Sequence, residues 1–234
     1  MTQAGTRRQQ GAHDASDAHA GGVGAVVMAA GAGRRMGGLP KALMEQGGAT
    51  LLERTVTLLA QAGAAHVVVV LGHHGARIAA VLQRLPPPAG AHLAWVHNPA
   101  PDDGPASSLR CALAALPPGL GAVLVALGDQ PLLQAQDARA LLAAWRARPA
   151  GVELVLPRHD GHMGHPVVFG DALRQVVQRT GQGVRAWRSA HSQQVQALDV
   201  PHARCTTDID ALQDLQRLRA EHGVALTLPG SADG

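Results

Sequence analysis

The sequence predicts a three-layer α/β/α sandwich, in which helices cover both faces of a mostly parallel, Rossmann-like β-sheet. Short runs rich in Val, Ala and Leu alternate along the chain with longer stretches whose apolar residues have helical spacing. This alternation is the pattern of βαβ units. The chain has 234 residues, of which 46% are hydrophobic and 16% charged, so it is long enough to bury one sizeable core.

The first half of the chain contains four apolar runs of the kind that form buried parallel strands. We expect strands at residues 23–29, 66–71, 92–97 and 122–127. Helices are expected at residues 50–62, 76–84, 107–116 and 134–146. The first of these helices opens with Thr50 and Glu53, which have the spacing of a capping box.

The pattern changes beyond Gly151. Short strands are expected at residues 152–157 and 166–169, around a turn rich in His and Gly, and one or two strands of the sheet are expected to be antiparallel. Further elements are expected at 171–179 and 184–189 (helices), 194–198 (strand) and 211–221 (helix). We find no internal repeat and no linker, so we expect a disordered leader at 1–22, one domain at 23–221 and a tail at 222–234.

Composition excludes several classes of function. With one Phe, three Trp and no Tyr, the chain lacks the aromatic platforms that stack nucleic-acid bases. Its net charge is only +3, without a dense basic stripe. Cys111 and Cys205 belong to no CxxC pattern and are expected to be reduced thiols. No apolar stretch reaches the ~20 residues of a membrane span, and residues 1–22 lack a signal-peptide core. The expected compartment is the cytoplasm.

A glycine-rich loop follows the first expected strand, with the sequence AlaAlaGlyAlaGlyArgArgMet at 29–36. Backbone free of side chains can approach a polyphosphate closely and direct N–H groups at it. Arg34, Arg35 and Lys41 add cationic charge. The loop has neither the GxGxxG spacing of a dinucleotide site nor the GK[ST] ending of a P-loop. Spacing alone therefore leaves two interpretations open, a phosphate-binding loop or a tight βα turn with solvated basic residues.

Acidic residues occur at two further points. Asp129 directly follows the strand at 122–127, and the carboxyl ends of such strands border the ligand site of α/β folds. A carboxylate there suits Mg²⁺, which binds one or two carboxylates together with substrate phosphates. Asp208 and Asp210 precede the last helix, where they could bind metal or cap the helix. His73 and His74, at the end of the second strand, could contact substrate or belong to a solvated loop.

Taken in order, these segments resemble a known family. The series consists of AlaAlaGlyAlaGlyArgArgMetGly with ProLys at 40–41, AsnPro at 98–99, Gly104, SerSer at 107–108, GlyAspGlnPro at 128–131, GlyHisPro at 164–166 and ThrAspIleAspAlaLeuGlnAspLeu at 207–215. It is similar to the MobA-like nucleotidyltransferases, most closely to their molybdenum cofactor cytidylyltransferase branch. The resemblance extends from Val23 to about Glu221 and implies a nucleotide-diphospho-sugar transferase-like fold.

The resemblance also implies roles for individual residues. Arg34, Lys41 and Asp129 would serve the reaction itself. Asp129 and Asp208 would hold Mg²⁺, with Asp210 as the alternative to Asp208. The nucleotide would contact Ala29, Ala30, Gly31, Ala32, Gly33, Arg35, Met36, Gly72, Asn98, Gly104, Ser107 and Ser108. The acceptor would lie against Gly164, His165 and Pro166.

The sequence departs from the family pattern after Asp210, where Ala211, Leu212 and Gln213 replace the usual Thr-Pro-Glu. The implied function is Mg²⁺-dependent transfer of a cytidylyl group from CTP to a molybdopterin-type cofactor, with release of pyrophosphate and delivery of the product to a molybdenum hydroxylase. The AlaAlaGly start of the loop favours CTP over GTP. The alternatives are a GTP-using or a sugar- or polyol-phosphate nucleotidyltransferase of the same fold, and a non-catalytic accessory protein that inserts the cofactor.

Overall fold

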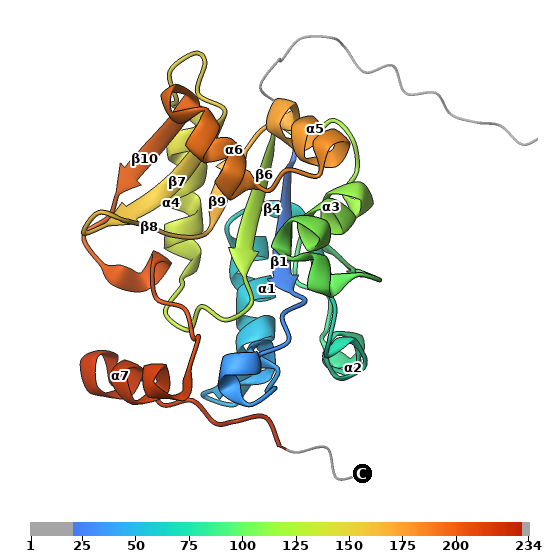
Figure 1. The fold of residues 1–234 in the computed structure, drawn as a ribbon, viewed down its shortest axis with the longest axis vertical. Coiled ribbons are helices and arrows are strands. Elements are labelled where there is room, and N and C mark those ends of the chain that lie inside the picture. The colour runs from blue at the N-terminus through green and yellow to red at the C-terminus, as the bar shows by residue number, and fades with distance from the viewer. Residues whose placement is uncertain (1–20, 231–234) are drawn as a thin grey trace, which may run out of the picture.

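An eight-stranded sheet runs through the middle of the protein (Figure 1). The structure is a computed structural model, and it describes residues 21–230. Along the sheet the strands follow the order β10-β7-β9-β6-β1-β4-β5, and β8 pairs with β7. Their bounds are β1 Val23–Ala29, β4 Ala64–Leu71, β5 His92–His97, β6 Ala122–Leu127, β7 Leu154–His159, β8 His162–Met163, β9 Val167–Phe169 and β10 Val195–Asp199.

Strand direction agrees with the expectation of a mostly parallel sheet. β1 pairs in parallel with β4 and β6, β4 with β5, and β10 with β7. β9 runs antiparallel to both β6 and β7, and β8 runs antiparallel to β7. The two antiparallel strands thus lie in the region beyond Gly151. A second sheet, the hairpin of β2 (Glu45–Gln46) and β3 (Ala49–Thr50), was not predicted.

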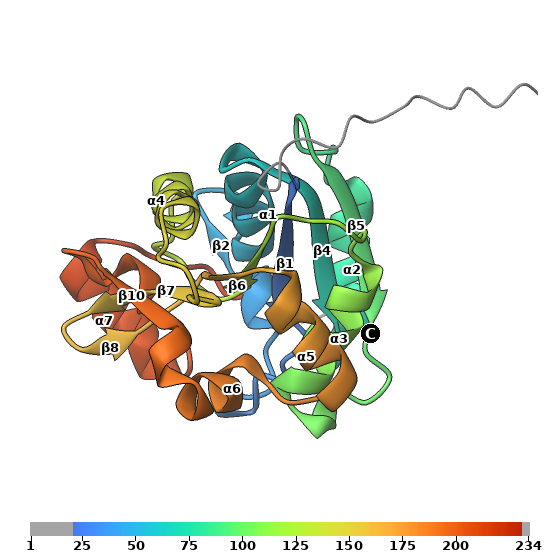
Figure 2. The same cartoon turned by 90° about the horizontal axis from the view of Figure 1, so that it is seen from above.

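Helices cover both faces of the large sheet (Figure 2). One apolar cluster joins the sheet to α1, α2 and α4, and a second joins its other face to α3, α5 and α6. The helices are α1 Leu51–Gln61, α2 Gly75–Arg84, α3 Pro105–Ala115, α4 Ala135–Arg146, α5 Asp171–Thr180, α6 Val184–Ala190 and α7 Leu212–His222. This confirms the three-layer α/β/α prediction. None of the helices in residues 21–230 has the length and apolar character needed to cross a bilayer.

Two helix starts test the expectations made from sequence. Thr50 Oγ1 accepts a hydrogen bond of 3.1 Å from Glu53 N, and Glu53 Oε2 accepts one of 2.7 Å from Thr50 N, so the predicted capping box is confirmed. The last helix begins at Leu212, one residue later than predicted. Its first turn is capped by Asp214, whose Oδ2 accepts hydrogen bonds from Ala211 N and Asp210 N. The alternative in which Asp208 or Asp210 caps this helix is therefore wrong.

A third, smaller apolar cluster lies beside the large sheet. It consists of Met36, Met44, Leu51 and Ile209, and Leu39, Leu215 and Leu226 pack against it. The chain after α7 returns to the same region, where Thr227 and Glu45 exchange backbone hydrogen bonds of 2.9 and 3.0 Å. Of the predicted terminal segments, leader residues 1–20 and tail residues 231–234 lie outside the described residues.

Candidate active site

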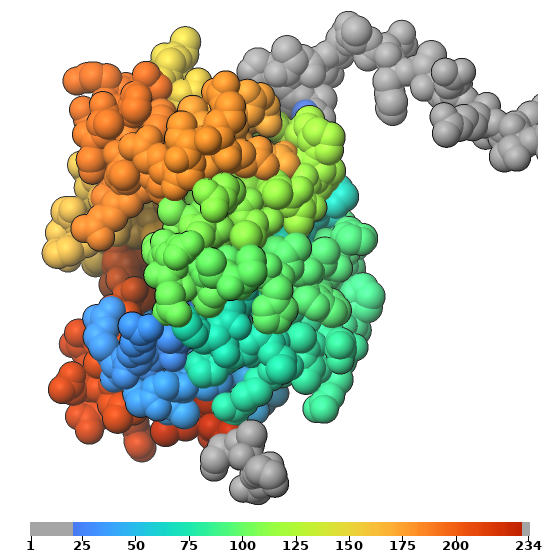
Figure 3. Space-filling model, turned by 45° about the vertical axis from the view of Figure 1, so that its right-hand side comes forward, coloured from blue at the N-terminus to red at the C-terminus, as the bar shows by residue number. Residues whose placement is uncertain are grey.

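A cavity of about 440 Å³ opens at the carboxyl ends of β1 and β6, where the fold predicts a ligand site. Figure 3 shows the surface hollowed between the N-terminal loop (blue), α3 (green) and the C-terminal segment (red). The cavity is lined by Met28, Ala29, Ala30, Gly31, Pro40, Lys41, Ala42, His74, Ile78, Pro101, Gly104, Pro105, Ser108, Leu127, Gly128, Asp129, Asp208 and Asp210. Segments far apart in the sequence therefore meet around one space.

The loop after β1 forms one wall of the cavity and is shaped by Gly33. This residue has a φ of +64°, and a Cβ there would lie 2.0 Å from the carbonyl oxygen of Leu39. Its own carbonyl accepts hydrogen bonds from Met36 N (2.8 Å) and Gly38 N (3.0 Å). Glycine at position 33 thus lets the loop fold back on itself. Ala29, Ala30 and Gly31, which precede this turn, line the cavity.

Met36 is placed differently from the expectation. Its side chain is 1% exposed and packs in the third cluster with Met44, Leu51 and Ile209 instead of lining the cavity. The Met36 side chain therefore does not line the cavity, and a contact of this residue with the nucleotide, through its backbone, stays a prediction. An apolar side chain next to two arginines gains more by burial than by facing phosphates. Met36 anchors the loop (η1, Arg34–Met36) to the core.

Lys41 lies among acidic groups at the floor of the cavity. Its Nζ contacts Asp129 Oδ2, lies 3.3 Å from Asp210 Oδ1 and donates a hydrogen bond of 2.6 Å to the carbonyl oxygen of Ile209. Burial opposes the charge on Lys41, but Asp129 and Asp210 outweigh it and raise the pKa of its ammonium group. Lys41 is thus held charged between two carboxylates, those of Asp129 and Asp210.

Burial and mutual repulsion both disfavour the charged forms of the Asp129 and Asp208 carboxylates. Burial raises the pKa of Asp129, against the opposing effect of Lys41. Burial also raises the pKa of Asp208, with further contributions from Asp129 and Asp210. A divalent cation bound among these groups would relieve their repulsion. The charge of the site therefore favours cation binding.

The backbone of Ile209 sets the position of these acids. Ile209 N donates a hydrogen bond of 3.2 Å to the carbonyl oxygen of Asp129, and its side chain is 1% exposed in the third cluster. Because Ile209 is buried, Asp208 and Asp210 on either side of it can both line the cavity. Sequence reasoning identified both acids but missed the apolar residue between them.

The donor set fits a hard divalent cation when it binds together with phosphate. Asp129 and Asp208 supply carboxylate oxygens to one cavity, and Mg²⁺ characteristically combines one or two carboxylates with phosphate oxygens and water. Within residues 21–230 no three His, Cys, Asp or Glu side chains form a preassembled metal site. A metal here would thus depend on oxygens brought by the nucleotide.

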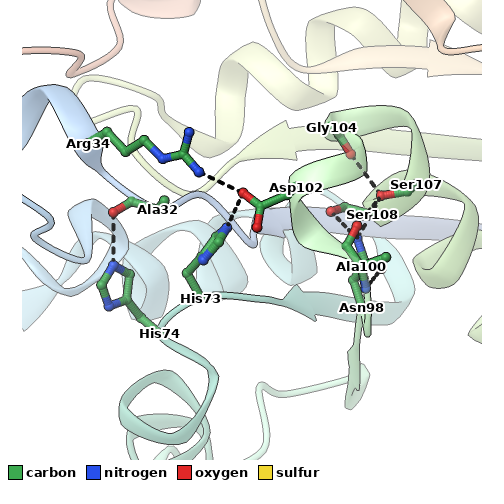
Figure 4. Close-up of polar contacts among 10 residues, drawn as sticks. All are labelled: Ala32, Arg34, His73, His74, Asn98, Ala100, Asp102, Gly104, Ser107 and Ser108. Atoms are coloured by element: carbon green, nitrogen blue, oxygen red, sulfur yellow. Dashed lines mark hydrogen bonds and ion pairs between the residues drawn. The ribbon is translucent and has the colours of Figure 1, made fainter.

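Asn98, Ser107 and Ser108 form a buried hydrogen-bond network at the start of α3 (Figure 4). Asn98 Nδ2 donates to Ser107 Oγ (2.8 Å), Ser108 Oγ (2.9 Å) and the carbonyl oxygen of Ala100 (3.2 Å). Of these three residues only Ser108 lines the cavity, together with Gly104, whose carbonyl oxygen accepts a hydrogen bond from Ser107 Oγ. Asn98 and Ser107 instead fix the turn η3 (Pro101–Asp103), which brings Pro101 to the cavity wall.

Gly72 lies where three loops touch. A Cβ on it would lie 2.5 Å from the carbonyl oxygen of Ala30 and 2.9 Å from Pro101 Cβ. Gly72 is not among the residues that line the cavity. Its lack of a side chain lets the loop after β4 pack against the loop after β1. Gly72 therefore supports the cavity wall without contacting the cavity.

Arg34 and Arg35 lie at the rim with exposed guanidinium groups. Arg34 Nη2 lies 2.8 Å from Asp102 Oδ1, and His73 Nε2 lies 3.3 Å from the same oxygen (Figure 4). Arg35 Nη2 lies 3.0 Å from Asp210 Oδ2. His74 Nε2 lies 3.2 Å from the carbonyl oxygen of Ala32. Sequence reasoning missed Asp102, which no motif marks.

The segment Gly164–Pro166 lies next to Asp129 without lining the same cavity. Gln130 Nε2 donates to the carbonyl oxygens of Cys205 (3.0 Å) and His165 (3.4 Å). His165 N donates to the carbonyl oxygen of Cys205 (2.8 Å), and the peptide bond between His165 and Pro166 is cis. Burial, with the charge of Arg188, lowers the pKa of His165 to about 4. The predicted acceptor segment is thus tied to the residue after Asp129.

Most of the chain matches the model of one protein family. Residues 25–220 match the model of the MobA-like NTP transferase domain, which is most of the chain. The match covers the loop after β1, Asp129, and the acidic pair Asp208 and Asp210.

Two groups of curated relatives share part of their length with this chain. Bifunctional protein GlmU of Synechococcus sp. (strain CC9311) is 34% identical over 151 residues, which cover 64% of this chain and 32% of GlmU. Bifunctional enzyme IspD/IspF of Clavibacter michiganensis subsp. michiganensis is 35% identical over 213 residues, which cover 90% of this chain and 50% of the enzyme. The chain thus spans about a third to a half of the length of these relatives.

Solved structures share the whole fold. Rv0371c from Mycobacterium tuberculosis H37Rv is 28% identical with a TM-score of 0.67, over 86% of this chain and 100% of that one. A complex of Rv0371c with manganese is also similar, with 26% identity and a TM-score of 0.63, over 85% of this chain and 98% of that one. At 15% identity, 4-diphosphocytidyl-2C-methyl-D-erythritol synthase from Anaerococcus prevotii still has a TM-score of 0.66, over 86% of this chain and 95% of that one. The nucleotide-diphospho-sugar transferase-like fold is confirmed.

Proposed function

The chain belongs to the MobA-like NTP transferase family and is a nucleotidyltransferase, and from this premise we propose which groups carry out the transfer and on what substrates. The observation that carries the proposal is the convergence of Lys41, Asp129 and Asp208 on one cavity that the glycine-rich loop also borders. A triphosphate bound there would lie between cationic and metal-binding groups.

The triphosphate would bind with its phosphates along the loop that Gly33 shapes. Ala29, Ala30 and Gly31 leave backbone exposed to the cavity, and Arg34 and Arg35 stand at its rim. Gly104 and Ser108 line the opposite wall, where base and ribose would lie. Ala32 and Gly33 belong to the same loop, while Gly72, Asn98 and Ser107 support these walls from behind.

Asp129 and Asp208 would hold the divalent cation, with Asp210 as the alternative to Asp208. The manganese complex of Rv0371c supports a divalent metal in this fold, and Mg²⁺ is the proposed ion. When bound, it supplies charge neutralisation for the phosphates. With a cation held by Asp129, Lys41 Nζ would be placed to bind phosphate oxygens of the nucleotide.

The reaction follows from these charges. An anionic oxygen of the acceptor attacks the α-phosphorus, a new P–O bond forms, and the bond to the bridging oxygen breaks as pyrophosphate leaves. An acceptor phosphate ionised at neutral pH brings its own nucleophilic oxygen, so no general base is required. The demands on the protein are positioning and charge stabilisation, which Arg34, Lys41 and Asp129 would meet.

For the acceptor, two classes compete. The sequence motifs favour a molybdopterin-type cofactor, with a molybdenum hydroxylase receiving the product, but none of the relatives reported above is described in those terms. The synthase from A. prevotii shares the fold alone at 15% identity, but by name it makes a diphosphocytidyl polyol, which makes a sugar or polyol phosphate an acceptor to test first. We therefore propose a phosphate-bearing acceptor that lies against Gly164, His165 and Pro166, with the sugar or polyol phosphate as the first candidate.

For the nucleotide we propose CTP. A structure of CMP:2-keto-3-deoxy-manno-octonic acid synthetase with this fold contains CTP, although its 14% identity carries the likeness of fold alone. The AlaAlaGly start of the loop favours the same nucleotide. GTP remains the alternative.

The test is a matrix of substrates. The purified chain is incubated with Mg²⁺ or Mn²⁺, with CTP or GTP, and with molybdopterin, a hexose 1-phosphate or a polyol phosphate, while pyrophosphate release is measured. We expect release with CTP and one acceptor class. Release with GTP alone would overturn the choice of base, and release with molybdopterin alone would reverse the preference for the sugar or polyol phosphate.

A further inference from the structure

Asp102 connects the two walls of the cavity mouth. Its Oδ1 lies 2.8 Å from Arg34 Nη2 on the loop after β1 and 3.3 Å from His73 Nε2 on the loop after β4 (Figure 4). Pro101 and Gly104, on either side of Asp102 in the chain, line the cavity, and so does Gly31 in the same loop as Arg34. The carboxylate therefore lies where a triphosphate would enter.

The anchoring of Asp102 differs from that of Arg34. Asp102 belongs to η3, and the buried Asn98 holds the start of this turn through Ala100, accepting a hydrogen bond of 3.0 Å from Ala100 N and donating one of 3.2 Å to its carbonyl oxygen. Arg34 has a long side chain that is 79% exposed. The backbone that carries Asp102 is therefore held by Asn98, whereas the long Arg34 side chain can turn away from it.

An ion pair of this kind breaks at little cost. The side chains of Arg34 and Asp102 are 79% and 66% exposed, and exposed pairs contribute little stability because water screens them. A triphosphate offers several charges to the same guanidinium, which binds phosphate oxygens well. The phosphates and Asp102 thus compete for one cation.

We propose that Asp102 is a positioning residue that acts through Arg34. It holds the guanidinium at the cavity mouth before the nucleotide binds, yields it to the triphosphate, and takes it back when pyrophosphate leaves. The proposal rests on the proposed function in one respect, namely that Arg34 meets the phosphates of the nucleotide. It adds that the affinity for triphosphate is lowered by a carboxylate that none of the sequence motifs includes.

Asp103 provides a matched control. It is the next residue in the same turn and is exposed, and its carboxylate makes no hydrogen bond or ion pair within residues 21–230. Asp103→Asn removes the same formal charge at nearly the same place. The difference between Asp102→Asn and Asp103→Asn therefore isolates the contact with Arg34 from general repulsion of the phosphates.

The experiment measures equilibrium binding of CTP by calorimetry, without acceptor, so that it does not depend on turnover. We expect Asp102→Asn to tighten CTP binding roughly two- to fivefold, the range that an exposed ion pair allows, and to tighten pyrophosphate binding by a similar factor. Asp103→Asn should change either affinity by less than about half of that effect. In an Arg34→Ala background the additional gain from Asp102→Asn should vanish. Asp102→Glu, which restores the carboxylate, should bind CTP as the wild type does.

Several outcomes overturn the proposal. If Asp102→Asn weakens CTP binding or lowers the midpoint of thermal unfolding by several degrees, Asp102 has a structural role and does not compete with the phosphates. If its effect equals that of Asp103→Asn, or persists without Arg34, the residue does not act through Arg34. Wild-type protein that binds neither CTP nor another triphosphate would instead refute the proposed function, which separates the two failures.

Discussion

Lys41 Nζ donates a hydrogen bond of 2.6 Å to the backbone carbonyl of Ile209, a residue 168 positions later in the chain. The contact joins the loop after β1 to the segment that carries Asp208 and Asp210. Ile209 N in turn donates to the carbonyl oxygen of Asp129. One buried apolar residue thereby sets the relative position of the groups expected to act on the nucleotide.

Ile209→Ala should loosen this arrangement. The side chain is 1% exposed in the cluster with Met36 and Met44, and truncating such a side chain typically costs about 2–4 kcal/mol. We expect a lower free energy of unfolding in urea and weaker Mn²⁺ binding in the presence of CTP, measured by electron paramagnetic resonance. Ile209→Val should lose only about 1 kcal/mol and keep the metal affinity. Equal metal affinity in the Ala variant would show that the packing of Ile209 does not position the acids.

Gly33→Ala should disrupt the loop after β1. The residue has a φ of +64°, and an added Cβ would lie 2.0 Å from the backbone oxygen of Leu39, so both strain and a clash oppose the substitution. We expect the free energy of unfolding to fall by more than about 1 kcal/mol and CTP binding to be lost.

Gly31→Ala provides the comparison, because a Cβ there would meet nothing within 4 Å. This variant should unfold like the wild type, yet bind CTP more weakly, since Gly31 lines the cavity. Thermal unfolding and calorimetry distinguish the two effects. A Gly31→Ala variant with unchanged CTP affinity would contradict close approach of the phosphates to this part of the loop.

Much of the fold could be predicted from the spacing of apolar residues and from the residues at the ends of helices and strands. Buried strands such as β1 and β6, and the capping box at Thr50 and Glu53, are encoded in a few neighbouring residues, so the sequence predicts them. The hairpin of β2 and β3 was missed because two-residue strands carry no periodic signal. In the same way the order of Gly, Asp and Lys segments predicted a site at this edge of the sheet. The burial of Met36 was missed because the cluster that surrounds it includes Ile209, a residue distant in sequence.

Arg174 illustrates a residue that no motif reveals. It is 6% exposed, and its guanidinium donates to the carbonyl oxygens of Leu113 (2.8 Å), Leu116 (2.6 Å) and Pro117 (2.7 Å), at the end of α3. Arg174→Met should leave these acceptors without donors and cost about 2–4 kcal/mol in urea unfolding. Arg179→Met, on the exposed side of the same helix, should cost less than about 0.5 kcal/mol. Similar losses in the two variants would show that these three hydrogen bonds of Arg174 do not stabilise the end of α3.

His165 should remain neutral through the physiological range. Burial and Arg188 lower its pKa to about 4 from an ordinary value of 6.5. An unfolded chain therefore takes up this proton at a higher pH than the folded one, and the free energy of unfolding should fall as the pH drops from about 6.5 to about 4. His165→Gln should reduce that slope, and NMR titration should give the low pKa directly. A His165 that titrates near 6.5 in the folded protein would contradict its burial next to Arg188.

The central claim is that this protein breaks the bond beyond the α-phosphorus of a triphosphate and moves the nucleotidyl group to an acceptor, with Asp129 required. The most direct test follows CTP labelled at the α-phosphorus with ³²P, in the presence of Mg²⁺ and the acceptor found active. We expect label in the acceptor together with stoichiometric pyrophosphate, and a loss of activity of at least about a hundredfold in Asp129→Asn. Release of orthophosphate with the label left in CDP, or full activity in Asp129→Asn, would contradict the central claim.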